Sequence, residues 1–296
     1  MRVTDFGRSD PPPATAQIPS TAGRPSRRES WPSKESVPAQ NDNYGGADLH
    51  IHTAFSDGMA EALALLDYVE TETDLDVIAI TDHDDIRGAW AAREIWARGR
   101  YRFDFVAGIE VTTIEGHLLA LYLEEPVPSL RPVEEVLAAV HRQGGICVIP
   151  HPMSPLTRSL DRKTIARIAA SKSEGIYFDG IEAVHRSPFL GAWRRTGTSL
   201  NRALDLNLAE LASSDSHFLT TIGSARTEFP GRTGEDLKTA IVQRTTRAIT
   251  GHCPTLLDIG LGQVLSQTVR GLTATPRVMG WGPTAFSFVR RILHRG

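Results

Sequence analysis

Residues 48–53 read Asp-Leu-His-Ile-His-Thr, a stretch in which polar and apolar side chains alternate strictly. This alternation is typical of a β-strand with one buried face, and it projects His50 and His52 to the same side of the strand. A Ser-Asp-Gly turn follows at residues 56–58 and adds the carboxylate of Asp57. We therefore expect a strand that ends in a group of side chains able to bind a metal ion.

Further apolar runs follow this strand, and helical patterns lie between most of them. The sequence predicts seven strands, at 48–52, 77–80, 105–111, 117–123, 146–149, 180–184 and 211–214. Helices are expected at 59–70, 86–98, 132–143 and about 200–207. Only six residues separate Glu110 from His117, too few for a parallel crossover, so this step is predicted to be irregular or antiparallel. Strands interleaved with helices predict a barrel-like α/β domain.

The chain divides by composition into three parts. Residues 1–44 hold seven of the 18 prolines and few apolar side chains, so they are predicted to be a disordered leader. Residues 45–255 are expected to form the α/β domain. Residues 256–296 form a basic tail: from Leu261 onward there are five arginines and no acidic residue. Its apolar side chains predict a short helix with one apolar face, formed by Phe286, Val289, Ile292 and Leu293.

The overall composition excludes several classes of protein. A net charge of -3 gives no basic footprint for a dedicated duplex-DNA binder. Two cysteines, Cys147 and Cys253, are too few for a disulfide scaffold or a thiolate zinc site. No apolar stretch is long enough for a transmembrane segment, and no secretion signal is recognisable. A cytoplasmic protein with no obligate protein partner is the expectation.

Nine polar side chains sit at the predicted strand ends or starts, and they include six of the ten histidines. They are His50, His52, Asp57, His83, Glu110, His117, His151, Asp215 and His217. In closed α/β sheets the carboxyl ends of the strands form the reactive face, so we expect these groups to converge. Imidazoles together with carboxylates, and no thiolate, suit Zn²⁺, Mn²⁺ or Fe²⁺.

These segments also resemble an ordered set of family motifs. Asp-Leu-His-Ile-His-Thr (48–53), Thr-Asp-His-Asp (81–84), Gly-Ile-Glu (108–110), Pro-His-Pro (150–152) and Ser-Asp-Ser-His (214–217) are similar to motifs of the polymerase and histidinol phosphatase (PHP) family. The resemblance spans about residues 46–250 and implies a distorted seven-stranded (β/α) barrel with three metal ions. It assigns His50, His52, Glu110 and Asp215 to one metal, Glu110, His117 and His151 to a second, and Asp57, His83 and His217 to the third.

The resemblance also implies an activity. The compact form of the family, with Gly-Ser-Ala-Arg-Thr-Glu-Phe at 223–229, is similar to small phosphoesterases. These hydrolyse nucleoside 3′,5′-bisphosphates or short 5′-phosphorylated oligonucleotides, the latter as 5′–3′ exonucleases, through a metal-activated hydroxide. A histidinol-phosphate-type phosphatase, a metal amidohydrolase and a non-catalytic, metal-stabilised module remain as alternatives. The absence of a lysine at any predicted strand end weighs against the amidohydrolase.

Individual roles follow from position. Asp215 is expected to orient the attacking hydroxide, and His217 or Asp82 to assist the leaving oxygen. Arg158 and Arg186 each follow a strand-end motif closely and are candidates to bind a second phosphate. His185 is a candidate to contact the metal ligands without binding a metal itself. His141, His252 and His294 are predicted to be structural or exposed.

Overall fold

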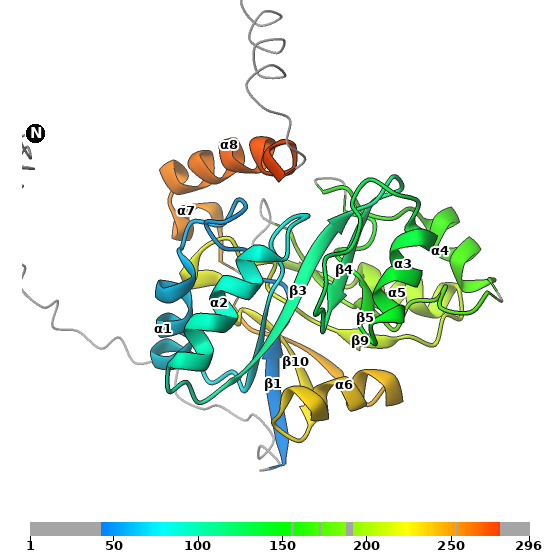
Figure 1. Cartoon of the computed structure of the whole chain (residues 1–296), viewed down its shortest axis with the longest axis horizontal. Helices are drawn as coiled ribbons and strands as arrows, with labels where there is room; N and C mark the ends of the chain where they lie inside the picture. Colours follow the sequence, from blue (N-terminus) through cyan, green and yellow to red (C-terminus); the bar gives the residue numbers. More distant parts are fainter. Residues whose placement is uncertain (1–42, 155–156, 172, 188–191, 253, 279–296) are drawn as a thin grey trace, which may run out of the picture. The chain divides into compact units, whose positions relative to one another are not determined.

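The computed structural model describes residues 43–154, 157–171, 173–187, 192–252 and 254–278. Within them, one nine-stranded sheet has the order β11-β10-β1-β2-β3-β4-β5-β6-β9, and β7 and β8 form a separate hairpin (Figure 1). The sheet strands are β1 (Tyr44–Asp48), β2 (Val77–Ile80), β3 (Asp104–Thr112), β4 (His117–Leu121), β5 (Ile146–Ile149), β6 (Gly180–Glu182), β9 (Ala209–Leu211), β10 (Ala225–Pro230) and β11 (Arg247–Thr250). The hairpin strands are β7 (His185–Ser187) and β8 (Ala192–Arg194).

The sheet curves round until the segments after β1 and β9 meet. Ile51 forms a parallel bridge with Ser216, and the Ser216 amide donates to the carbonyl of His50 at 3.0 Å. The carboxylate of Asp48, at the end of β1, accepts from the amides of Ser214 and Gly223 at 3.0 and 2.8 Å. Seven strands, β1 to β6 and β9, therefore surround a nearly closed barrel, which confirms the predicted fold class; β10 and β11 extend the sheet beyond β1.

One detail of the strand prediction needs correction and another is confirmed. The first strand runs from Tyr44 to Asp48 and not from 48 to 52, so it begins inside the predicted leader. At position 45 of this strand, a Cβ atom would lie 2.7 Å from the carbonyl oxygen of Gly231. This close backbone approach permits only glycine. The step from β3 to β4 is antiparallel, with Thr112 opposite His117, as the short connection predicted.

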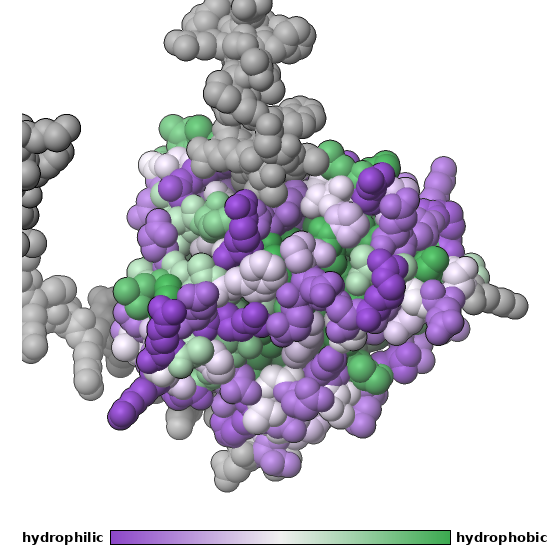
Figure 2. All heavy atoms as spheres, in the orientation of Figure 1, coloured by the Kyte–Doolittle hydropathy of each residue, from purple (hydrophilic) through white to green (hydrophobic). Residues whose placement is uncertain are grey.

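Helices cover the sheet because its strands are apolar on both faces. Every residue of β2 and β5 is buried, as expected for strands packed between layers. The helices are α1 (Ala62–Glu72), α2 (Arg87–Arg98), α3 (Val133–Arg142), α4 (Arg162–Ala169), α5 (Thr196–Ala203) and α6 (Gly234–Gln243). Figure 2 shows a mostly hydrophilic surface on this side, with apolar residues in small separate groups.

The chain continues after β11 into α7 (Leu256–Ile259) and α8 (Leu261–Val278). The helix in the basic tail was expected at about 286–293, which lies outside the described residues, whereas α8 occupies 261–278. Residues 1–42 of the predicted leader also lie outside them. No helix in the described part of the chain combines the length and hydropathy needed to cross a membrane.

Candidate metal centre

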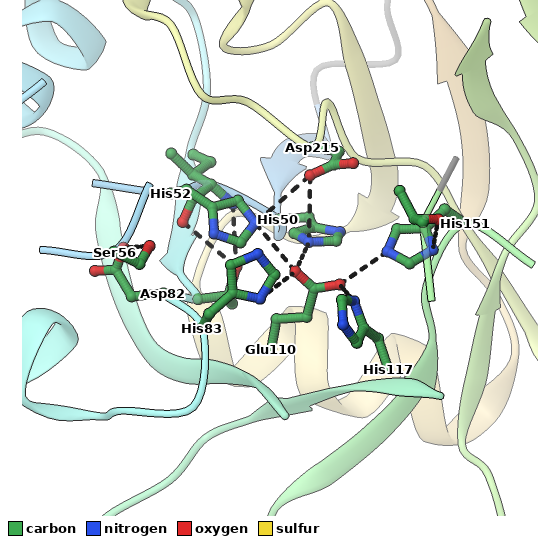
Figure 3. A network of polar contacts seen from close by, with 12 residues as sticks. His50, His52, Ser56, Asp82, His83, Glu110, His117, His151 and Asp215 are labelled. Carbon is green, nitrogen blue, oxygen red and sulfur yellow. Dashed lines mark hydrogen bonds and ion pairs between the residues drawn. The ribbon is translucent and has the colours of Figure 1, made fainter. Parts of the chain in front are cut away.

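The carboxylate of Glu110, on β3, lies at the centre of a cluster of imidazole rings (Figure 3). Its Oε2 lies 3.2 Å from Nε2 of both His50 and His52 and 3.3 Å from Nδ1 of His83. Its Oε1 lies 2.7 Å from Nδ1 of His117 and 2.8 Å from Nε2 of His151. The two oxygens therefore face two different groups of histidines, the arrangement that a carboxylate bridging two metal ions needs.

Asp215 and Asp57 complete the cluster on two other sides. Asp215 Oδ1 lies 3.5 Å from Nε2 of both His50 and His52. Asp57 Oδ2 lies 3.0 Å from His217 Nε2 and 3.8 Å from His83 Nε2, and its Oδ1 lies 3.5 Å from His52 Nδ1. All nine side chains that the sequence singled out are thus brought together.

The loop that carries Asp57 is held in place by Asp82, which is fully buried after β2. Its carboxylate accepts from the amide of Thr53 at 2.8 Å, the hydroxyl of Thr53 at 2.6 Å and the hydroxyl of Ser56 at 2.5 Å. A carboxylate with these partners and no exposure is not placed to give a proton to a leaving group. The expectation that Asp82 assists the leaving oxygen is therefore replaced by a positioning role.

Several ring nitrogens of the cluster lack a hydrogen-bond partner. His50 Nε2, both ring nitrogens of His52 and His83 Nδ1 are buried and make no hydrogen bond within the described part of the protein, although carboxylate oxygens lie 3.2–3.5 Å away. The side chains of the cluster form four groups whose ligand atoms lie close enough together to hold a metal ion. They are His52–Asp57–His83–His217, His50–Glu110–His151, His50–His52–Asp215 and His83–Glu110–His117. Imidazole nitrogens and carboxylate oxygens at this density suit divalent metal ions.

The electrostatics of the cluster favour a bound cation. Burial opposes ionisation of Asp57, Glu110 and Asp215, but the neighbouring imidazoles outweigh it and hold their pKa values well below the usual range. Burial also opposes protonation of His52, yet Asp215 and Glu110 raise its pKa to about 10. The acidic pKa values of the carboxylates and the raised pKa of His52 both show that this cluster stabilises positive charge, and a divalent ion held by these residues would supply that charge.

Three of the nine non-glycine residues with a positive φ in the described part of the chain lie at these strand ends. Asp84, His151 and Asp215 have φ values of 58°, 28° and 49°, in the left-handed region that non-glycine residues seldom adopt. Asp84 is held there by hydrogen bonds to the Thr112 amide at 2.6 Å and hydroxyl at 2.8 Å. Strain that the surrounding structure maintains is characteristic of functional sites.

Two residues at the centre were not predicted from the sequence. Glu182, at the end of β6, is buried; its Oε1 lies 3.0 Å from His50 Nδ1, and its Oε2 accepts from the His151 amide at 2.6 Å. The signal was present, because residues 180–182 repeat the Gly-Ile-Glu of 108–110. Gln267, on α8, donates from Nε2 to Asp57 Oδ2 at 3.1 Å, and nothing in the local sequence pointed to it.

The other candidates have different surroundings. Arg158 donates from Nη2 to the carbonyls of Thr113 and Ile114 at 3.3 and 3.1 Å, so this nitrogen braces the loop before His117. Arg186 lies on β7, and its side chain is outside the described atoms. His185 is buried beside the centre. His252 is exposed, as expected, and His294 lies outside the described residues.

His141 is structural, as one of the two expectations had it, but it is not an exposed helical residue. Its ring nitrogens lie 2.8 Å from the carbonyl oxygen of Gly175 and 3.0 Å from Asp179 Oδ2. The ring stacks on Tyr177 at a centroid distance of 4.1 Å. Substitution of His141 is therefore not neutral for stability, and His141 is unsuitable as an inert comparison for the metal ligands.

Comparison with known proteins agrees with this architecture. A family model described as PHP-associated matches residues 197–246. An uncharacterized protein of Methanocaldococcus jannaschii is 30% identical over 176 residues, which cover 56% of this chain and 92% of the relative. The 5′-3′ exoribonuclease Rnm of Salmonella typhimurium is 33% identical over 88 residues, 28% of this chain and 30% of that protein.

Among solved structures, a two-domain protein of Bacteroides vulgatus that contains a predicted PHP-like metal-dependent phosphoesterase superposes with a TM-score of 0.57 at 20% identity. The match covers 71% of this chain and 65% of that protein, slightly less than two thirds of its length. The barrel, the motifs at its strand ends and these similarities define a metal-binding α/β barrel of a known class. The chain belongs to the PHP family.

Proposed function

We propose that this protein is a metal-dependent phosphoesterase with the nine side chains of the cluster as ligands of three divalent ions. The observation that supports this is the set of buried, unpaired imidazole nitrogens that face the carboxylates of Glu110, Asp57 and Asp215. Bound ions of this kind lower the pKa of water and polarise a phosphoryl oxygen. Mn²⁺, Zn²⁺ and Fe²⁺ all suit the donor set.

The protein's own residues orient the ligands and the reactants. Asp215 is the most exposed of the three carboxylates, with 30% of its side chain accessible, and it lines the cavity beside the cluster. It is therefore the group proposed to orient the attacking water. His217 is proposed mainly as a ligand, because its Nε2 faces Asp57 and its Nδ1 lies 3.1 Å from the Asp215 carbonyl oxygen.

The proposed substrate is a small phosphorylated molecule, either a nucleoside 3′,5′-bisphosphate or a short 5′-phosphorylated oligonucleotide. Residues 45–125, which supply six of the nine ligands, hold 17 acidic residues against five arginines and no lysine. This segment repels an extended phosphate backbone. The partial similarity to an exoribonuclease supports a nucleotide substrate. Arg158 and Arg186 are proposed to bind a second phosphate. Arg158 would do so through the guanidinium N–H groups that do not donate to the loop carbonyls.

Chelation combined with a ligand substitution tests the activity. The metal-free protein is expected to hydrolyse no phosphate ester, and Mn²⁺ or Zn²⁺ should restore turnover. His117→Ala should lose most turnover and roughly one metal ion per chain, since it removes a ligand beside Glu110. His252→Ala, at an exposed position, serves as the matched control and should retain both. Undiminished turnover in protein verified to be metal-free would refute the proposal.

Substrate size is tested separately. A nucleoside 3′,5′-bisphosphate should be hydrolysed faster than a long duplex at equal phosphate concentration. The difference should be largest at low salt, where the acidic segment is least screened. If the duplex is preferred at low salt, the protein is a nuclease for extended nucleic acid and the small-substrate proposal is wrong.

A further inference from the structure

Three side chains that could bind a metal ion lie together outside the cluster described above. The ligand atoms of His141, Cys147 and Asp179 lie within 4.8 Å of one another. His141 is in the last turn of α3, Cys147 is the second residue of β5, and Asp179 directly precedes β6. Cys147 is separated by roughly 13 Å of strand from His151, the cluster residue that follows β5. The two groups of ligands therefore lie at opposite ends of β5.

The hydrogen bonds of His141 leave a place for a cation between its ring and Asp179. Its Nδ1 lies 2.8 Å from the carbonyl oxygen of Gly175, which can only accept a hydrogen bond, so Nδ1 carries a hydrogen. The Nε2 of a neutral ring would then face Asp179 Oδ2 at 3.0 Å as one acceptor facing another. Either a second ring proton or a metal ion must therefore lie between them. In protein without an ion at this site, the proton takes that place.

The distance between these two atoms suits a zinc ion. Zinc lies about 2.0–2.2 Å from imidazole nitrogens and carboxylate oxygens, which sets two such ligands about 3.3 Å apart in a tetrahedral site. The Gly175 carbonyl fixes the tautomer and the orientation of the His141 ring, as the partners of zinc-binding histidines do. Tyr177 stacks on the same ring at a centroid distance of 4.1 Å. The imidazole is thus held with Nε2 directed at the carboxylate.

Cys147 adds a sulfur ligand to this pair. Its backbone amide donates to Asp179 Oδ2 at 2.7 Å, which holds the carboxylate beside the cysteine. The side chain is fully buried, and burial together with Asp179 raises the pKa of the thiol well above its usual value. A cysteine in these surroundings is not a nucleophile, although Cys, His and Asp also form the catalytic groups of thiol hydrolases. Metal binding, in which the ion displaces the thiol proton, fits a buried cysteine better.

We propose that His141, Cys147 and Asp179 bind one Zn²⁺ ion at a structural site separate from the nine-ligand cluster. The thiolate favours Zn²⁺ over Mn²⁺, which prefers oxygen ligands. Three protein ligands leave the fourth position to water. With one thiolate, the site differs from the multi-cysteine zinc sites that the cysteine count excludes. The ion joins α3 to the starts of β5 and β6, so it stabilises the folded barrel at the end away from the cluster.

Cobalt spectroscopy of the full-length protein tests this site. Co²⁺ takes the place of Zn²⁺, and a cobalt–thiolate bond gives a near-ultraviolet charge-transfer band that imidazole and carboxylate ligands do not give. None of the nine cluster ligands is a cysteine, so the cluster cannot produce this band. The Co²⁺-loaded wild type should show the band. Cys147→Ser should abolish it and bind about one ion per chain less than the wild type.

Two further variants keep the test decisive if Cys147→Ser folds poorly. Cys253→Ser changes the only other cysteine of the chain and should leave the band and the metal content unchanged. Asp179→Asn removes the charged ligand from a different element, so the Co²⁺ concentration that gives half of the band should rise roughly tenfold or more. Mn²⁺-dependent turnover should persist in Asp179→Asn, because the nine ligands of the cluster are intact.

Each of four results would overturn the zinc site. They are no band in the wild type, a band that survives Cys147→Ser, a band lost in Cys253→Ser, and an unchanged Co²⁺ affinity in Asp179→Asn. A wild type that shows the band but hydrolyses no phosphate ester would overturn only the phosphoesterase function, because the zinc site does not depend on it.

Discussion

The roles of Glu110 and Glu182 follow from which neighbours each of their two carboxylate oxygens contacts. Glu110 directs one oxygen to His117 and His151 and the other to His50, His52 and His83. Glu182 divides its oxygens between the His50 ring and the His151 backbone. Glu110 is therefore placed to bind metal, whereas Glu182 fixes the orientation of two ligands.

Glu182→Gln tests this positioning role. The amide keeps the size of the side chain but replaces one of the two carboxylate oxygens, which contact the His50 ring and the His151 amide, by an NH2 donor, so one of the two contacts is lost. We expect a 10- to 100-fold loss of metal affinity, the usual cost of an outer partner, with turnover falling in parallel. Metal content after dialysis against a metal buffer gives the readout. Glu72→Gln, at an exposed position, is the control, and equal metal content in the two variants would contradict the role.

Among the helices and strands, α8 affects the site because it contacts the loop that carries Asp57. Among residues 261–271, the part of α8 whose burial is described, Val264, Gln267, Arg270 and Gly271 are half-buried, a helical spacing that defines one face. Gln267 contacts Asp57, and Arg270 donates to the carbonyl of Gly58 at 2.6 Å. This face of α8 therefore packs on the loop that carries Asp57.

Two glycines of α8 make a matched pair for testing that contact. A Cβ atom at Gly271 would lie 3.2 Å from Asp57 Oδ2, whereas one at Gly262 would have nothing within 4 Å. Gly271→Val should displace α8 or the carboxylate and lower both metal occupancy and turnover, measured on the same samples. Gly262→Val makes the same change in helix propensity and should leave both intact. Equal behaviour of the two variants would show that α8 does not constrain Asp57.

His141 connects α3 to the segment before β6, and this connection depends on pH. Burial disfavours the imidazolium, but the hydrogen bonds to Asp179 and to the Gly175 carbonyl raise the pKa of His141 above its usual value of 6.5. A group whose pKa is raised in the folded state binds protons more tightly there than in the unfolded chain. Its stabilisation is therefore complete below pH 6.5 and is lost as pH rises through the raised value.

Urea unfolding of His141→Ala and the wild type at several pH values tests this. The deficit of the variant in free energy of unfolding should be larger at pH 6 than at pH 9. His252→Ala, at an exposed site, should show little deficit at either pH. A deficit of His141→Ala that grows with pH would contradict the assigned charge state.

At the scale of the whole molecule, side chains close the gap between β9 and β10 that strand pairing leaves open. The hydroxyl of Thr227, on β10, accepts from the Ala212 amide at 3.0 Å and donates to the Ala212 carbonyl at 2.9 Å. Thr227 and Ala212 are fully buried. One threonine therefore substitutes for a pair of backbone hydrogen bonds where the sheet turns back on itself.

Thr227→Val removes that hydroxyl without changing the size of the side chain. It leaves the amide and carbonyl of Ala212 unpaired, so we expect a loss of about 1–3 kcal/mol in the free energy of unfolding. Chemical denaturation measures it. Thr71→Val, at an exposed position on α1, should stay within about 0.5 kcal/mol of the wild type. A neutral Thr227→Val would mean that this contact between β10 and the segment after β9 adds nothing measurable to stability.

The sequence by itself determined the barrel class, the antiparallel step at Glu110 and the nine polar side chains that converge. Each of these features follows from local sequence. An apolar run predicts a strand, and the residue after it lies at the carboxyl edge of the sheet regardless of the conformation of the loops. The strand at Tyr44–Asp48 was misplaced because Gly45 is explained only by its close approach to Gly231. These two residues lie far apart in the sequence.

Only the tertiary structure decided the roles of Glu182, His141, Thr227 and α8. Each depends on a partner between 15 and 210 positions away, such as Ala212 for Thr227 and Asp57 for Gln267. No local period or turn signal records such a pairing, because it arises when separate elements bury their surfaces against one another. The nine side chains of the cluster could therefore be predicted from the strand ends, whereas their orientation, the cavity beside them and the helix that lines it exist only in the folded molecule.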